Sequence, residues 1–289
     1  MGDSTSTNTF LPRQATEPTW ERWLELAGDG GEQVGLVSLK EIPSIPAGSI
    51  IHDNGCGTGA TSYAIMASVP PEISSSFEIT ATDIMEKALD VYRARSAASS
   101  WPSEVLLMDA DELSFPDETF THSIASAMIF NGPRNNGIDA VKEMRRTLKP
   151  GGKLVINSFA FASKDEPLLA AARATRPEGT PLPVHGLGQW ADPNFLVSIV
   201  EAGGFAKESM TVQQREMFAN IGDFDRHTEL TWSYRGRAKD IGWTKEDEER
   251  WDEAVEIFRT ELRKSEGFKM FDDGTAVLRS IINVVTATK

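Results

Sequence analysis

The sequence has little of several residue types that would indicate particular functions. Cysteine occurs once in 289 residues, at Cys56, which excludes a disulfide framework and a zinc site built from cysteines. Positive charge is scarce, because 29 Lys and Arg stand against 43 Asp and Glu, giving a formal net charge of -14. Nucleic acids and anionic membranes are bound by clustered Lys and Arg, so we expect neither as a partner.

Long apolar runs are also missing. No stretch approaches the ~20 apolar residues that cross a bilayer, and residues 1–9 are rich in Ser and Thr without the apolar core of a signal peptide. No group of residues has the composition and spacing of a metal site. We therefore expect a cytoplasmic protein that acts on a small molecule, uses no metal and exists as a monomer or a homodimer.

Residues 50–59 contain an apolar run that ends at Asp53 and opens into Gly55, Gly57 and Gly59. A strand, a glycine loop and a helix in this order predict a nucleotide site, with a turn that binds no ligand as the alternative. Dinucleotide-binding enzymes space their glycines as G-x-G-x-x-G, whereas here they fall as G-x-G-x-G. Asp53 would also repel a pyrophosphate and attract a cation. Both features disfavour a nicotinamide-dependent oxidoreductase.

Residues 53–59, read as D-x-G-x-G-x-G, resemble the first motif of the class I S-adenosylmethionine-dependent methyltransferases. The resemblance continues at 148–152, which read L-K-P-G-G before a predicted strand at 154–159. Residues 113–121, which read L-S-F-P-D-E-T-F-T, are similar to the family's L-P-F-D-x-x-F-D pattern, with Thr121 where an Asp is common. The resemblance therefore covers about residues 49–159 and implies S-adenosylmethionine as the cofactor, whose sulfonium and ammonium suit the charge of Asp53.

Acidic residues follow the second and third predicted strands, at 77–82 and 104–108. An acid at the end of the second strand of a Rossmann-like sheet accepts hydrogen bonds from ribose hydroxyls, so we assign that role to Asp83, with a helix N-cap as the alternative. The resemblance implies that Asp109 and the backbone of Ala110 hold the adenine edge, with a solvated loop as the alternative. The full set of cofactor-binding residues that the resemblance implies is Asp53, Asn54, Gly55, Cys56, Gly57, Gly59, Asp83, Ile84, Asp109, Ala110 and Met128.

We expect an α/β fold with a Rossmann-like, seven-stranded, mostly parallel sheet, helices on both faces and a helical cap. About sixty residues separate the sixth strand, predicted at 205–212, from the last strand, predicted at 275–286, so the cap is mainly an insertion. The predicted divisions are an N-terminal arm and lid helix (1–48), the cofactor-binding core (49–159), a lid segment (160–190), further core (191–212), a helical cap insertion (213–268) and the last strand of the core (269–289).

Insertions at the carboxyl ends of such strands lie where ligands bind and would form the acceptor pocket. Their aromatic residues favour an apolar, ring-sized acceptor, with core packing as the alternative. The candidate acceptor-binding residues are Trp20, Trp23, Phe130, Asn131, Trp190, Trp232 and Tyr234. An alcohol or phenol would benefit from a general base, for which His185 and His227 are the candidates. His52 and His122 lie in predicted strands and are interpreted as packing residues.

The predicted function is direct, in-line methyl transfer from S-adenosylmethionine to a small, largely apolar or aromatic metabolite. The layout resembles the small-molecule branch of the family found in fungal secondary metabolism. The alternative on the same fold is a protein that binds S-adenosylmethionine but catalyses a cyclisation, elimination or rearrangement. The sequence leaves open whether oxygen, sulfur, nitrogen or carbon receives the methyl group.

Overall fold

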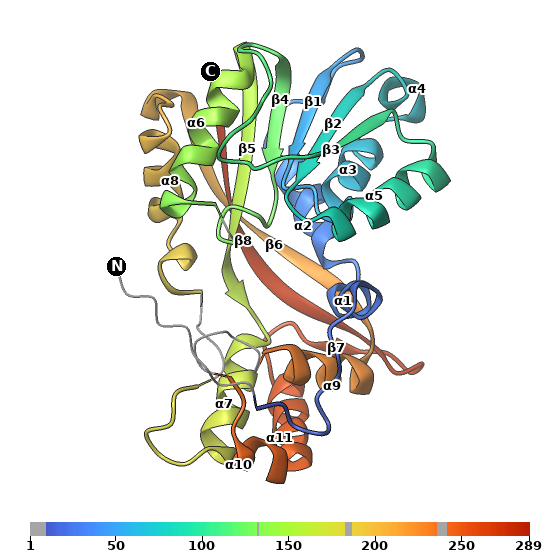
Figure 1. The fold of residues 1–289 in the computed structure, drawn as a ribbon, viewed down its shortest axis with the longest axis vertical. Helices are drawn as coiled ribbons and strands as arrows, with labels where there is room; N and C mark the ends of the chain where they lie inside the picture. The colour runs from blue at the N-terminus through green and yellow to red at the C-terminus, as the bar shows by residue number, and fades with distance from the viewer. Residues whose placement is uncertain (1–9, 132, 183–186, 236–241) are drawn as a thin grey trace. The chain divides into compact units, whose positions relative to one another are not determined.

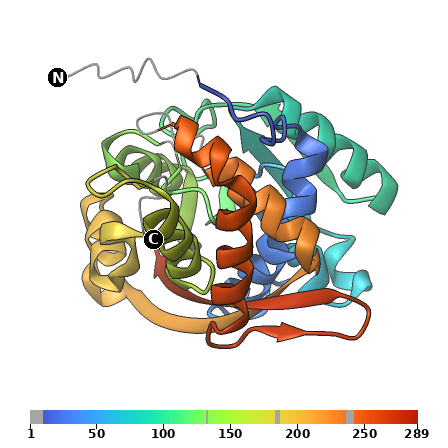
Figure 2. The same ribbon diagram turned by 90° about the horizontal axis from the view of Figure 1, so that it is seen from below.

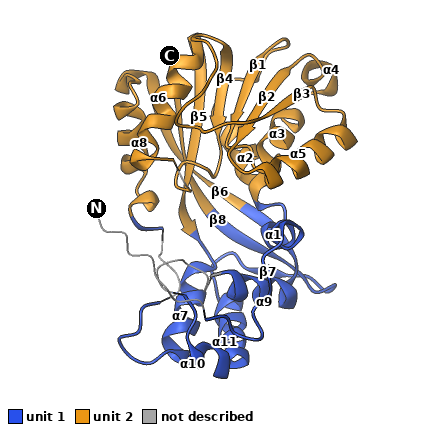
Figure 3. Cartoon of the chain, in the orientation of Figure 1, with its two compact units in different colours: residues 1–30, 162–188, 218–280 blue, residues 31–161, 189–217, 281–289 orange. Residues whose placement is uncertain are grey.

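The structure is a computed structural model that describes residues 10–131, 133–182, 187–235 and 242–289. The chain forms two compact units, each assembled from three segments (Figure 3). Unit 1 contains residues 1–30, 162–188 and 218–280, and unit 2 contains residues 31–161, 189–217 and 281–289. Within the described ranges, no helix combines the length and the apolar composition that crossing a membrane requires.

A mixed sheet of eight strands forms the framework of the protein (Figure 1). Seven strands follow the order β3-β2-β1-β4-β5-β8-β6, and the first five of these pair in parallel. Their bounds are β1 Ile50–Asn54, β2 Glu78–Asp83, β3 Ser103–Leu107, β4 Phe120–Ala125, β5 Leu148–Ala162, β6 Met210–Asp223 and β8 Thr275–Thr288. The predicted Rossmann-like α/β fold is confirmed, and the eighth strand, the two-residue β7 Lys269–Met270, is an addition to the seven expected.

Within its described part, unit 2 has six helices, and three of them (α5, α6 and α8) share hydrophobic clusters with strands of this sheet. The helices are α2 Gly30–Leu39, α3 Ala60–Ala67, α4 Pro71–Ser74, α5 Glu86–Ser99, α6 Ile138–Thr147 and α8 Pro193–Ala202. On α6, Val141 and Met144 are fully buried against strand residues such as Leu154 and Ile156, as their three-residue spacing predicts. Helix α8 begins where the sequence predicts, since Asp192 accepts a hydrogen bond from the backbone of Asn194.

Unit 1 is mainly helical. Its helices are α1 Trp20–Ala27, α7 Asp165–Thr175, α9 Phe224–Arg235, α10 Lys245–Glu249 and α11 Trp251–Arg263. Helix α11 packs against α7 and α9 in both ribbon views (Figures 1 and 2). Thr244 and Asp247 form the capping box at the start of α10. The antiparallel β7–β8 hairpin is the red ribbon at the lower edge of Figure 2.

The sixth strand differs from its predicted bounds of 205–212. Strand β6 begins five residues later, at Met210, and continues to Asp223. Its second half alternates, with Met217, Ala219 and Ile221 buried and the residues between them less so, which is the two-residue period of a strand. The helical part of the insertion therefore begins at Phe224 rather than at residue 213.

Candidate active site at the carboxyl ends of the strands

The register of the parallel strands brings the predicted cofactor residues to one edge of the sheet. Asn54 pairs with Thr82, and Asp83 pairs with Leu107, so β1, β2 and β3 end side by side. The segments that follow these strands carry Gly55 to Gly59, Ile84 and Asp109. The strand register therefore brings Asp53, Asp83 and Asp109, which are far apart in the sequence, to the same edge of the sheet.

Asp53 is the most enclosed of these acids. Its side chain is fully buried, and its Oδ2 accepts a hydrogen bond from Ser62 Oγ at 2.7 Å. Its Oδ1 and the Nδ2 of the neighbouring Asn54 have no hydrogen-bond partner among the described residues. Burial raises the pKa of Asp53 to about 7, and the hydrogen bonds from Ser62 partly oppose that rise. Asp53 therefore does not carry a fixed negative charge, because a pKa of about 7 leaves it partly protonated near neutral pH.

Three glycines give the loop after β1 its shape. Gly55, Gly57 and Gly59 have φ values of 70°, 51° and 92°, in the left-handed region that favours glycine. A Cβ on Gly55 would lie 2.1 Å from Met128 Cγ, whereas a Cβ on Gly57 would have no atom within 4 Å. The loop is consequently packed against Met128 at Gly55 and open at Gly57, where a ligand could approach the backbone.

Asp83 connects this loop to α5. Its Oδ2 accepts a hydrogen bond from the backbone of Gly57, and its Oδ1 accepts one from the backbone of Met85, both at 2.9 Å. These two bonds hold the carboxylate in one orientation and leave lone pairs on both oxygens. Ile84, between Asp83 and α5, is 64% exposed and places an apolar surface beside the carboxylate.

The acids after β3 are held by an arginine from the segment after β4. Asp111 Oδ2 accepts hydrogen bonds from the Arg134 backbone at 2.6 Å and from Arg134 Nε at 3.2 Å. Asp109 Oδ1 accepts from the backbone of Asp111 at 2.9 Å, and its Oδ2 lies 3.8 Å from the Arg134 guanidinium. These contacts hold the Asp109 to Asp111 turn, which contains Ala110, in one conformation, with the Asp109 side chain exposed to solvent.

Comparisons with known proteins agree with this geometry. Residues 51–152 match the family model described as a methyltransferase domain. Residues 51–152 are thus a methyltransferase domain of the class I S-adenosylmethionine-dependent type. Methyltransferase ktnA of Aspergillus niger is 23% identical over 227 residues, which cover 71% of this chain and 74% of that protein. Methyltransferase tpcH of Aspergillus fumigatus is 23% identical over 247 residues, which cover 83% of this chain and 84% of that protein.

A solved structure shows the same fold. Phosphoethanolamine N-methyltransferase 2 of Haemonchus contortus, in complex with phosphomonomethylethanolamine and S-adenosylhomocysteine, superposes with a TM-score of 0.54. The superposition covers 93% of this methyltransferase and 56% of the other chain, at 16% sequence identity. The methyltransferase assignment thus rests on the family match and the relatives, and the superposition supports the fold.

Asn157 organises the end of β4 in this methyltransferase. Its Oδ1 accepts a hydrogen bond from the backbone of Ala127 at 2.8 Å, and its Nδ2 donates to Ser38 Oγ and Ser126 Oγ at 3.0 Å. Ala127 has a φ of 52°, which is uncommon for a residue with a side chain. The buried amide therefore fixes a strained turn that presents Met128 to Gly55.

Two of the aromatic residues predicted to bind the acceptor meet in unit 2. The rings of Phe130 and Trp190 are 6.0 Å apart, Phe130 lies 6.0 Å from Phe159, and Trp190 lies 5.0 Å from Phe195. Asn131 is exposed, and its Nδ2 donates to the carbonyl of Ala127 at 3.0 Å. Phe130 and Trp190 thus form one partly buried aromatic cluster near the end of β4.

The remaining aromatic candidates lie in unit 1. Trp20 and Trp23 are on α1, and the half-exposed ring of Trp23 is 6.4 Å from Tyr234. The Tyr234 hydroxyl accepts a hydrogen bond from the backbone of Thr19 at 3.1 Å. Trp232 is only 1% exposed and packs against neighbouring tryptophans in the core of unit 1. Trp232 therefore has no surface for a ligand in this conformation.

Of the two histidines predicted as general bases, the structure describes only His227. His185 lies outside the described residues. His227 on α9 is 2% exposed, and neither ring nitrogen has a hydrogen-bond partner among the described residues. Burial, with a smaller contribution from Lys164, lowers the pKa of His227 to about 3, so its ring is neutral at pH 7 and a weak base.

His52 and His122 are packed in β1 and β4. His52 stacks on Phe120 at 4.8 Å and its Nε2 lies 2.9 Å from Thr82 Oγ1, while burial lowers its pKa to about 3. His122 has a hydrogen bond to Thr121, and burial lowers its pKa to about 4. Burial likewise raises the pKa of the Cys56 thiol far above its usual range, so the thiol stays protonated.

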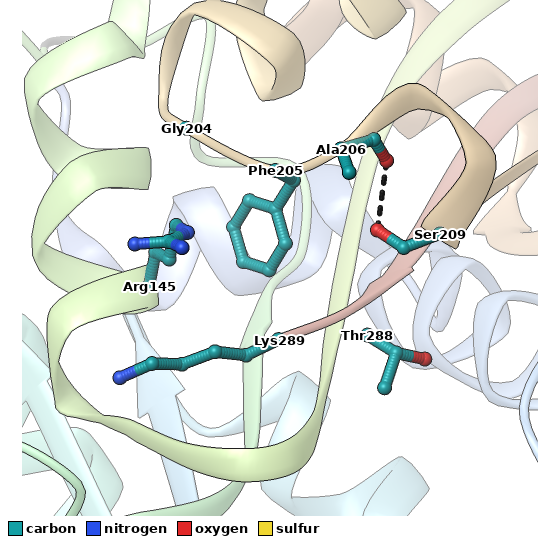
Figure 4. Close-up of a pocket in the computed structure, with 7 residues that line it drawn as sticks. All are labelled: Arg145, Gly204, Phe205, Ala206, Ser209, Thr288 and Lys289. Carbon is teal, nitrogen blue, oxygen red and sulfur yellow. Dashed lines mark hydrogen bonds between the residues drawn. The ribbon is translucent and has the colours of Figure 1, made fainter.

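Unit 2 also has a surface hollow of about 430 Å³, lined by Arg145, Gly204, Phe205, Ala206, Ser209, Thr288 and Lys289 (Figure 4). The backbone of Lys289 bonds to Gly151 and Gly152, near the start of β5. The hollow therefore lies at the amino ends of the parallel strands. That is the opposite edge of the sheet from the glycine loop, so the hollow is not part of the candidate active site.

Proposed function

We propose that this chain binds S-adenosylmethionine at the carboxyl ends of β1 to β4 and transfers its methyl group to a small, largely apolar or aromatic metabolite. The cofactor supplies a methyl group already activated by attachment to a sulfonium. The chain's own residues bind the cofactor, align the acceptor and exclude water, which are the contributions that such a displacement needs most.

The observation that carries this proposal is the placement of Asp83 beside the open side of Gly57. The two backbone amides that bind Asp83 fix its carboxylate at the end of β2, where ribose hydroxyls could donate to its remaining lone pairs. Asp53 Oδ1 and Asn54 Nδ2 are buried and have no hydrogen-bond partner among the described residues. They are therefore an acceptor and a donor available to a ligand next to the loop. The residues present therefore fit a ligand with a ribose and a cationic end.

An adenine fits the next part of this edge. Ile84 and Leu107, at the ends of β2 and β3, are 64% and 58% exposed and offer apolar surfaces for a flat ring. Asp109, held by Arg134 and by the backbone of Asp111, has an exposed carboxylate that can accept from an exocyclic amine. We assign to Asp109 and the backbone of Ala110 the adenine edge, with Met128 against the glycine loop.

For the acceptor we propose aromatic contacts. Phe130 and Trp190 in unit 2 retain partly exposed side chains and are proposed to contact the acceptor. Trp20, Trp23 and Tyr234 in unit 1 are also at least partly exposed, and their role in acceptor binding stays a prediction from the sequence. We omit Trp232 because it is part of a core. A histidine whose pKa is about 3 takes a proton poorly, so we propose that His227 is not the general base and that any histidine base is His185.

Methyl transfer is tested directly with methyl-labelled S-adenosylmethionine. The purified protein is incubated with the labelled cofactor and extracts of small metabolites, and products are read by mass spectrometry. We expect a labelled product that disappears in Asp83→Ala. The control is Asp90→Ala, which removes an exposed carboxylate from α5 and should leave the product unchanged.

Two results would refute the proposal in different ways. If S-adenosylhomocysteine binds and unlabelled metabolites change without label transfer, the chain catalyses a reaction other than methylation. If neither S-adenosylmethionine nor S-adenosylhomocysteine binds, the assignment of the site is wrong.

A further inference from the structure

Two hydroxyl groups connect helix α5 to the acid at the end of β1. The Tyr92 hydroxyl donates to Ser62 Oγ at 2.7 Å, and Ser62 Oγ donates to Asp53 Oδ2 at 2.7 Å. All three side chains are fully buried. Tyr92 is held in place by an edge contact with Trp101 at 5.7 Å and by the glycine loop, where a Cβ on Gly59 would lie 3.0 Å from its ring.

The other groups near Asp53 do not favour its ionised form. The titratable groups that face it are Asp83 from β2, Cys56 from the glycine loop and Tyr92 from α5, and none of the three carries positive charge. Burial and the charge of Asp83 favour the protonated acid, whereas the hydrogen bonds from Ser62 favour the carboxylate. Two donors of Ser62 thus favour a negative charge at this position, its hydroxyl and its backbone N–H, and the hydroxyl chain is the part of this support that a side-chain substitution can remove.

We propose that Ser62 and Tyr92 are positioning residues that keep Asp53 ionised for a cationic cofactor, and that cofactor affinity consequently depends on pH. This inference rests on the proposed function and adds to it how the protein distinguishes a charged nucleoside from a neutral one. The Ser62 hydroxyl acts directly, since a donor to a carboxylate stabilises its charged form. The Tyr92 hydroxyl acts through Ser62, because donating to Ser62 Oγ polarises that hydroxyl and strengthens its own donation.

The sign of the pH dependence follows from the charge of the ligand. When Asp53 is protonated, its attraction for the ammonium and sulfonium is lost, so affinity should fall as pH decreases below the Asp53 pKa. At higher pH Asp53 is ionised and affinity should level off. Removal of the Ser62 hydroxyl makes the carboxylate harder to ionise and moves this curve to higher pH, and removal of the Tyr92 hydroxyl moves it less.

The experiment is calorimetric titration of the intact chain with S-adenosylmethionine between pH 5.5 and 8. In the wild type we expect affinity to fall by about tenfold per pH unit below the midpoint. The midpoint should move up by about one unit in Ser62→Ala, which is about a tenfold loss of affinity at low pH, and by less in Tyr92→Phe. Tyr63→Phe removes a half-exposed hydroxyl from the same helix α3 and should leave the curve unchanged.

A neutral probe separates charge recognition from general stability. We would repeat the titrations with 5′-methylthioadenosine, which has neither the ammonium nor the sulfonium, and expect affinity that does not vary with pH in any variant. Ser62→Thr keeps a hydroxyl and should restore the wild-type midpoint. If Ser62→Ala does not fold, Tyr92→Phe serves as the test, since it removes the other hydroxyl of the chain.

Three outcomes would overturn the inference. Wild-type midpoints in both Ser62→Ala and Tyr92→Phe would show that the hydroxyl chain does not set the charge of Asp53. An equal pH dependence for the neutral probe would show that the titrating group does not recognise the cation. A wild-type protein that binds neither probe would refute the proposed function and this inference with it, whereas the first two outcomes leave the proposed function intact.

Discussion

Arg176 and Asp247 form an ion pair inside unit 1, 71 positions apart in the chain. Arg176 Nη2 lies 2.7 Å from Asp247 Oδ2 and Nε lies 2.9 Å from Oδ1, and the two side chains are 1% and 0% exposed. The same Oδ2 accepts a hydrogen bond from the Thr244 backbone at 2.8 Å. One carboxylate therefore ties the end of α7 to the start of α10.

Removal of that carboxylate should strongly destabilise unit 1. Asp247→Ala leaves a buried guanidinium without its counter-charge, so we expect the free energy of unfolding to fall by about 3–5 kcal/mol. Urea unfolding measures the change, with Asp252→Ala on the exposed side of α11 as the control. A loss below about 1 kcal/mol would contradict the prediction, since that is the range of an exposed ion pair.

The glycine loop should respond differently to alanine at two of its positions. Gly55→Ala should destabilise the fold more than Gly57→Ala, because its Cβ would lie 2.1 Å from Met128 Cγ while that of Gly57 meets no atom within 4 Å. Both changes also incur the cost of a left-handed residue, about 1–2 kcal/mol. Gly57→Ala should instead mainly reduce S-adenosylhomocysteine affinity in a calorimetric titration. Equal effects of the two changes on stability would contradict the packing described for the loop.

Asn157→Leu should lower both stability and cofactor affinity. The change leaves the Ala127 amide, Ser38 and Ser126 without their present partner, and each unpaired buried group costs about 1–3 kcal/mol. Thermal melts and S-adenosylhomocysteine titration measure the two effects. The matched control is Asn194→Leu on the exposed side of α8, for which a change within about 0.5 kcal/mol is expected. An equal response of the two variants would show that the buried amide has no special role.

Acid should destabilise the protein through its buried histidines. The pKa of His227 is lowered to about 3 in the folded state, so the unfolded chain binds its proton first and stability falls as pH decreases from about 6.5 toward 3. His227→Phe should make the free energy of unfolding less dependent on pH in this window. His122→Phe should have a smaller effect, since the pKa of His122 is lowered only to about 4. Urea unfolding at several pH values measures this dependence. If the free energy of unfolding changes with pH equally in the wild type and His227→Phe, the prediction is contradicted.

Asp53 should act on stability in the opposite sense. Its folded-state pKa is raised to about 7, so the stability it contributes is present at low pH and is lost as pH rises through 7. Without cofactor, Asp53→Asn should therefore be more stable relative to the wild type at pH 8 than at pH 5. Chemical unfolding at these two pH values measures the difference, and a difference that does not change with pH would show that Asp53 titrates normally.

The parallel half of the sheet was predictable because its strands carry local signals. The run that ends at Asp53, the glycines after it and the L-K-P-G-G turn at 148–152 each specify a boundary by chemistry within a few residues. The bounds of β6 were not predicted, because Gln213 to Arg215 interrupt the apolar pattern with polar residues. The alternation that identifies the strand resumes only at Met217.

The supporting residues of the site were harder to see. Ser62 and Tyr92 are separated by thirty positions and meet only through the packing of α3 and α5, so no spacing in the sequence indicates their contact. Arg134 likewise meets Asp111 across two loops. The role of Asn157 could have been predicted from the sequence, because it is a polar residue directly after the apolar Leu154, Val155 and Ile156 of a strand. A buried polar side chain at such a position needs hydrogen-bond partners.

Each compact unit is assembled from three stretches of chain, and this has a consequence for dissection of the protein. Unit 1 draws on residues 1–30, 162–188 and 218–280, so neither unit corresponds to a contiguous fragment that could be expressed alone. A truncation that extends beyond residue 30 from the N-terminus, or beyond residue 281 from the C-terminus, would remove parts of both units at once. We therefore expect single protease cuts to yield fragments that remain associated, and exchanges with relatives to succeed only when all three stretches are moved together.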